Sequence, residues 1–138
     1  MIYEESTIQK NIIQYLQLMK IYAIHIPNER KTSAQAMMRL IALGLRPGAP
    51  DLELWIPKPG VDRNALYVAM GTRTKYHGPL PLDGDHTLVK VCYIEVKRPR
   101  GKQSQNQIKF AQRCSIAGID YYVAYSVEDV ENIIKKYL

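Results

Sequence analysis

The stretch Tyr93-Ile94-Glu95-Val96-Lys97 has the alternating pattern of a β-strand. Strand side chains point alternately to two faces, so Ile94 and Val96 are expected in a core. Glu95 and Lys97 then share the other face, about 7 Å apart. An isolated Glu-X-Lys pattern is common on solvated strand faces. The stretch therefore needs a second feature before it indicates a functional site.

Pro50-Asp51 supplies that feature, because it opens a second alternating segment over 51–56. If this strand pairs with 93–97 so that Asp51 lies opposite Glu95, the two carboxylates meet. Mg²⁺ prefers oxygen ligands, and the Val96 carbonyl is a candidate third ligand. Lys97 would orient or deprotonate a water that the metal makes more acidic. The pattern predicts phosphodiester hydrolysis, whereas carboxylates more than about 8 Å apart would indicate a structural domain with wet strand faces.

The rest of the chain predicts an α/β fold in one domain, residues 1–138. Ser104 and Gln107 fit a capping box at the start of one helix. The Pro- and Gly-rich segment 57–87 is interpreted as an extended hairpin or lobe, with a strand at 65–70. The expected helices span 4–19, 32–43, 104–117 and 126–137, and the other expected strands span 21–26, 88–97 and 119–125.

Composition restricts the class of protein further. The chain has 138 residues, 46% of them hydrophobic, and its net charge is +6. This charge suits a polyanionic partner such as nucleic acid, although a merely basic protein explains it equally well. Two cysteines form no disulfide framework, and no signal peptide or long apolar run is visible. We therefore expect a soluble cytoplasmic protein without a membrane partner.

Several motifs resemble one family. Residues 44–52 (GLRPGAPDL), 94–98 (IEVKR), 101–104 (GKQS) and Gln107 are similar to the VRR-NUC domain, the virus-type replication-repair branch of the PD-(D/E)XK nuclease superfamily. The resemblance covers nearly the whole chain, including Glu5–Gln9. It implies a restriction-endonuclease-like core, with a mixed β-sheet flanked by helices, and metal-dependent DNA cleavage. Small members resemble phage proteins, and some act as dimers on branched DNA. This implies a homodimer on four-way junctions or flaps, a role in DNA repair, and a phage-encoded origin with action in the host cell.

The resemblance also implies roles for individual residues. Asp51 and Glu95 would be Mg²⁺ or Mn²⁺ ligands, and Lys97 would be the catalytic lysine. Glu5 would be an additional acid that faces the metal, although the dipole of the first helix explains an acid there equally well. Gln107 would lie near the catalytic site, although the capping box by itself also accounts for it.

Six basic residues flank the proposed site. They are candidate phosphate contacts, which would position DNA without reading its sequence, or they form a solvated basic rim. They are Arg30, Lys31, Arg46, Arg98, Arg100 and Lys102.

His25, His77 and His86 have no metal-binding spacing and are interpreted as incidental. A second hypothesis remains open, in which the chain binds branched DNA with little or no catalysis.

Overall fold

A computed structural model describes residues 4–27, 33–72, 78 and 87–138. In this part of the chain helices and strands alternate, in the predicted order except for one additional helix between the second and third strands. No helix there is both long and apolar enough to span a membrane. The elements are α1 (Glu5–Leu18), β1 (Tyr22–His25), α2 (Ala34–Ala42), β2 (Leu52–Pro57), α3 (Arg63–Thr72), β3 (Val89–Val96), α4 (Gln105–Ala117), β4 (Asp120–Ala124) and α5 (Val127–Lys135).

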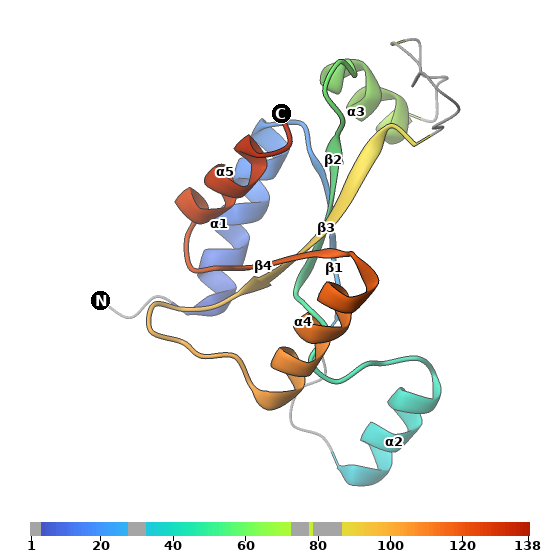
Figure 1. Cartoon of the computed structure of the whole chain (residues 1–138), viewed down its shortest axis with the longest axis vertical. Coiled ribbons are helices and arrows are strands. Elements are labelled where there is room, and N and C mark those ends of the chain that lie inside the picture. Colours follow the sequence, from blue (N-terminus) through green and yellow to red (C-terminus); the bar gives the residue numbers. More distant parts are fainter. Residues whose placement is uncertain (1–3, 28–32, 73–77, 79–86) are drawn as a thin grey trace.

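The strands form one mixed sheet in the order β1-β2-β3-β4. The first two pairings are antiparallel, and β3 pairs with β4 in parallel. Helices α1 and α5 lie on one side of the sheet, and α4 lies on the other (Figure 1). Helix α2 contributes no buried residue and extends away from the sheet, at one end of the molecule (Figure 1). The predicted mixed sheet flanked by helices is therefore confirmed.

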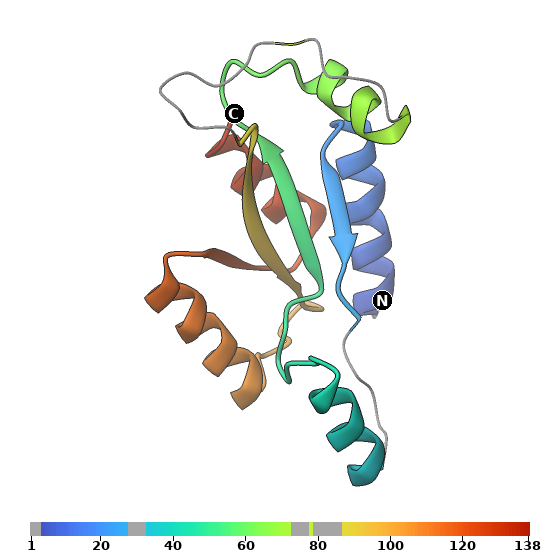
Figure 2. The same ribbon diagram turned by 90° about the vertical axis from the view of Figure 1, so that its right-hand side faces the viewer.

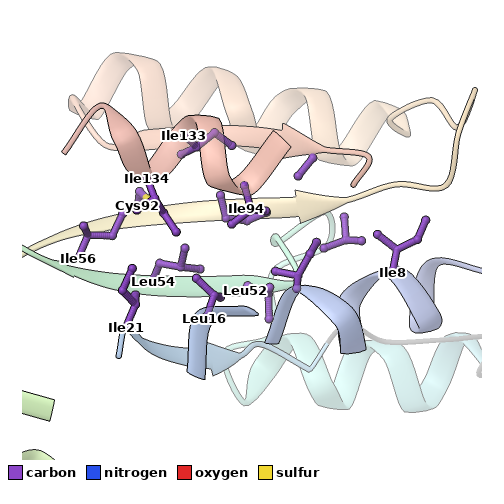
Figure 3. Close-up of a cluster of buried hydrophobic side chains, with 14 residues drawn as sticks. Ile8, Leu16, Ile21, Leu52, Leu54, Ile56, Cys92, Ile94, Ile133 and Ile134 are labelled. Carbon is purple, nitrogen blue, oxygen red and sulfur yellow. The ribbon is translucent and has the colours of Figure 1, made fainter. Parts of the chain in front are cut away.

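The main core lies between the sheet and the α1–α5 layer (Figure 3). Helix α1 buries residues that recur every four positions, the spacing of one helical face. Strands β2 and β3 bury alternate residues, which leaves Glu95 on the opposite face of the sheet, where α4 packs. The core includes Ile8, Ile12, Leu16, Leu52, Leu54, Ile56, Cys92, Ile94, Val96, Val130, Ile133 and Ile134.

The strand predicted at 65–70 is wrong, because these residues belong to helix α3. The Ala65 N–H donates to the Asp62 carboxylate at 3.0 Å, which caps the helix start. Leu66 and Ala69 are buried three positions apart, as on one helical face. A short, continuously apolar run does not distinguish a strand from a helix by its period. The hairpin or lobe predicted at 57–87 otherwise remains a prediction, since 73–77 and 79–86 lie outside the described residues.

The loop before β2 is held against the start of α4. Gly48 has a φ of +83°, and a Cβ there would lie 2.2 Å from the Asn106 carbonyl oxygen. Only glycine allows so close an approach in this conformation. This contact places the loop that carries Asp51 beside the first turn of α4, where Gln107 lies.

Gly48→Ala should be much more destabilising than Gly60→Ala. Both glycines have a positive φ, but nothing lies within 4 Å of a Cβ at Gly60. Both variants should lose about 1–2 kcal/mol through backbone strain. Gly48→Ala should lose about 1–3 kcal/mol more through overpacking against α4. Urea denaturation of both variants measures the difference, and equal losses would contradict the close packing.

Candidate active site

Strand register brings Asp51 and Glu95 together. Leu52 pairs with Ile94, so one further step along the two antiparallel strands places Asp51 opposite Glu95. The Asp51 Oδ2 accepts a hydrogen bond of 2.7 Å from the Val96 N–H. The Asp51 carbonyl also accepts from the Ile26 N–H at 2.8 Å. Asp51 is therefore fixed between the ends of β1 and β3, in the pairing that the sequence hypothesis requires.

The Glu95 carboxylate lies in a buried and unevenly satisfied environment, with the residue only 1% exposed. Its Oε1 accepts from the Gln107 Nε2 at 2.8 Å, and the Lys97 Nζ lies 3.7 Å from the same oxygen. Its Oε2 is buried and has no hydrogen-bond partner among the described residues. Burial without a partner is costly for a carboxylate oxygen, so this atom is suited to an additional ligand.

The electrostatic environment of Glu95 is equally unusual. Burial, followed by the negative charge of Asp51, raises the pKa of Glu95 to about 8, although the Lys97 ammonium lowers it. A divalent cation beside the two acids would stabilise their charged forms. The donor set fits Mg²⁺ or Mn²⁺, which accept carboxylate oxygens. Within the described ranges, no three side chains of His, Cys, Asp or Glu form a metal-binding group, so two carboxylates would need backbone oxygen or water to complete the site.

Gln107 combines the two roles that the sequence left open. Its backbone N–H donates to the Ser104 Oγ at 3.2 Å, and its Oε1 accepts from the Ser104 N–H at 2.8 Å. The predicted capping box is thus confirmed. Because the Ser104 N–H can only donate, the carboxamide must direct Oε1 toward it and Nε2 toward Glu95. The helix cap therefore sets the orientation of the hydrogen-bond donor to the buried acid.

A cleft of about 660 Å³ opens over this centre. Asp51, Glu95 and Gln107 line it together with Arg46 from the preceding loop. Glu5, at the start of α1, also lines the cleft, and its charge raises the pKa of Glu95 slightly. The first turns of α1 and α4 and the loop before β2 thus contribute to one cavity.

Three of the other predicted DNA contacts lie within the described residues but not in the lining of the cleft. Arg98, Arg100 and Lys102 are exposed in the segment between β3 and α4, and they do not line the cavity. Arg30 and Lys31 lie outside the described residues. Of the six basic candidates, Arg46 is the one that the described structure places in the cleft.

Two further polar residues of the cleft were not recognised in the sequence. His25 and Gln9 both line it, and the Gln9 Nε2 lies 2.9 Å from the His25 Nδ1. The two residues are 16 positions apart, on different elements, so no local spacing indicates their contact. Glu53 does not join the centre, because its Oε2 accepts from the Trp55 Nε1 at 2.9 Å.

Glu95→Gln should change how stability depends on pH in EDTA. The pKa of Glu95 rises from 4.5 to about 8 on folding, so the folded state binds more protons than the unfolded state between these values. This group's contribution to the free energy of unfolding therefore falls as pH rises through that window, by about 1.4 kcal/mol per pKa unit at most. The variant has no such titration and should lack this decline in urea denaturation.

Glu128→Gln is the matched control, since Glu128 is exposed in the first turn of α5. It should retain the decline of the wild type. Mg²⁺ should restore stability at pH 8 in the wild type and much less in Glu95→Gln. Parallel pH profiles for the wild type and Glu95→Gln would show that Glu95 ionises at its ordinary pKa.

Comparison with known proteins agrees with the motifs. The VRR-NUC domain profile matches residues 3–128. A solved structure described as a VRR_NUC domain protein is 15% identical, with a TM-score of 0.61 over 99% of this chain and 88% of that chain. Another, described as a VRR_NUC domain, is 18% identical, with a TM-score of 0.51 over 97% of each chain. No curated protein matches.

The two structural likenesses establish the fold, and the profile match covers most of the sequence. The mixed sheet with helices on both faces is the PD-(D/E)XK core that the resemblance implied. The acidic pair lies at the ends of β2 and β3, with a lysine two positions after Glu95. The chain therefore belongs to the VRR-NUC family of PD-(D/E)XK nucleases.

Proposed function

We propose that this nuclease-family protein is a metal-dependent DNA endonuclease that hydrolyses phosphodiester bonds in branched DNA such as four-way junctions or flaps. One observation carries the proposal. The buried Glu95 has an unpartnered carboxylate oxygen beside an Asp51 that is anchored to the neighbouring strand. An acidic pair of this kind is poorly satisfied by itself, and a bound cation would stabilise it.

Asp51, Glu95 and the Val96 carbonyl are the proposed ligands of Mg²⁺ or Mn²⁺. Glu5 is the candidate for a further ligand because it lines the same cleft, although it forms no three-acid group with Asp51 and Glu95 among the described residues. When bound, the ion supplies positive charge for the scissile phosphate and lowers the pKa of the attacking water. The carboxylates are held in advance by the Val96 N–H and the Gln107 amide, which limits the reorganisation needed for the reaction.

Lys97 is the proposed catalytic lysine. It is only 8% exposed, and its ammonium lies 3.7 Å from the Glu95 Oε1. From this position the ammonium would balance the charge of the acids and orient the attacking water, and only its neutral amine form could take a proton from that water. Gln107 engages the Glu95 Oε1 and leaves Oε2 available for the cation.

The basic residues would bind the substrate backbone. Arg46 lines the cleft, and the exposed Arg98, Arg100 and Lys102 follow the strand that carries Glu95. A net charge of +6 supports binding to a polyanion. The preference for branched DNA rests on the resemblance to small VRR-NUC proteins. A homodimer would present two such clefts to the two strands of a symmetric junction.

Asp51→Ala and Lys97→Ala should each reduce cleavage by at least about 100-fold, since each removes a group that acts on the reaction centre. Four-way-junction, flap and duplex DNA are compared with Mg²⁺, Mn²⁺ and EDTA. Lys109→Ala is the control, because Lys109 is exposed on α4. It should cleave like the wild type.

The same assay distinguishes a catalytic nuclease from a module that only binds branched DNA. Junction binding without turnover under any metal would contradict catalysis and favour the module. Cleavage that is equal in the wild type, Asp51→Ala and Lys97→Ala would show that the catalytic centre lies elsewhere.

Gln107→Glu should separate the helix cap from the contact with Glu95. Glutamate also completes a capping box, so the helix start keeps its cap. The new carboxylate would repel Glu95, where the amide donates a hydrogen bond of 2.8 Å. Cleavage should fall about 10-fold or more while circular dichroism retains the helical signal. Unchanged cleavage would assign Gln107 to the helix cap only.

A further inference from the structure

One wall of the cleft is formed by α1 and the end of β1. Glu5 and Gln9 line it from α1, and His25 lines it from the last position of β1. Helix α1 runs beside β1 (Figure 2). The Ile26 N–H donates to the Asp51 carbonyl at 2.8 Å, which holds the end of β1 level with Asp51. His25 thus lies beside the proposed metal centre.

The contact with Gln9 determines which atom the imidazole presents to the cleft. With the Gln9 Nε2 2.9 Å from the His25 Nδ1, the amide donates and Nδ1 accepts. The proton of a neutral ring is then on Nε2. If the ring becomes cationic, the carboxamide can turn and accept from Nδ1–H. With the amide oriented as it is, the Nε2 of His25 is a hydrogen-bond donor in the neutral ring, and the cationic ring donates from Nε2 as well.

A donor on this wall would serve a DNA backbone that passes the acidic centre. The cleft is lined by the acids Glu5, Asp51 and Glu95, which repel phosphate. Arg46 enters from the loop before β2, whereas no lysine or arginine of the described part of α1 lines the cavity. On the wall formed by α1 and the end of β1, His25 is the described cleft-lining side chain that can carry a positive charge.

We propose that the His25 Nε2 donates a hydrogen bond to a non-bridging oxygen of a phosphate adjacent to the scissile one. Gln9 is the positioning residue for the ring. This proposal rests on the proposed nuclease function, because it assigns the same cleft a substrate contact. A structural role would instead limit the pair to joining α1 to β1, so its loss would lower stability without an effect on DNA.

Substitutions of His25 test the contact, because the residue is exposed and its replacement should not prevent folding. His25→Gln keeps a donor near the position of Nε2. His25→Asn keeps a polar group near Nδ1 and loses the distal donor. His25→Ala and His25→Asn should raise KM about 10-fold and change kcat less than threefold, whereas His25→Gln should stay within about threefold of the wild-type KM.

Gln14→Ala is the control, since Gln14 is exposed on α1 and does not line the cleft. Gln9→Ala should raise KM about threefold in the wild type and not at all in the His25→Ala background, because Gln9 acts through the ring. A KM that is unchanged in His25→Ala, or a Gln9→Ala effect that persists without His25, would overturn the proposal.

Single methylphosphonates in the DNA identify the contact directly, because each removes the charge of one phosphate. Affinity is measured in the Lys97→Ala background, where the DNA should remain intact. One position beside the mapped cleavage site should weaken binding about 10-fold with His25 and have no effect in His25→Ala. Equal losses at every position would overturn the contact. Absence of cleavage by the wild type would instead contradict the nuclease proposal, whereas a methylphosphonate position that weakens binding only when His25 is present would still support the phosphate contact.

Discussion

The hydrogen bond from the Val96 N–H to the Asp51 carboxylate is the interaction on which the site depends. It extends the β2–β3 pairing one step beyond its last backbone pair and fixes an acid against the neighbouring strand. The Asp51 carbonyl simultaneously receives the end of β1. Asp51 thus joins three strands at the end of the sheet where the cleft opens. The positions of Glu95 and His25 follow from that junction.

Stability and proposed function oppose each other at Glu95. A carboxylate that is 1% exposed and has one unpartnered oxygen is unfavourable in the folded chain. Gln107 and Lys97 offset part of this cost, because both lie at the same Oε1. The remaining oxygen is left for a ligand that the polypeptide does not supply. Natural sites commonly retain such destabilised groups where function requires them.

The sequence was most informative where a local rule coincides with tertiary structure. Alternation predicted β2 and β3, and the spacing of Ser104 and Gln107 predicted the cap of α4. It failed at 65–70, where a continuously apolar run satisfies both periods and the capping Asp62 determines a helix. The family motifs drew attention to Asp51 and Glu95, but no motif indicates that the cap also orients a donor toward Glu95.

Contacts between segments that are distant in the sequence limit how much of the site can be predicted from it. His25 and Gln9 meet only because α1 packs beside β1, and neither residue has a distinctive neighbour in the sequence. Arg46 differs from Arg98, Arg100 and Lys102 only in its position relative to the cleft, which charge and composition do not reveal. Tertiary placement therefore decides which polar residues belong to the site.

The loose attachment of helix α2 affects how freely its sequence can change. It borders the cleft through Met37, yet it buries none of its residues in the core. Because few core contacts constrain it, mutations in this helix can accumulate, lengthen it or replace it at little cost to folding. The proposed catalytic acids, in contrast, are attached to the two central strands of the sheet. Changes in α2 would therefore alter the border of the cleft without disturbing the core that holds Asp51 and Glu95.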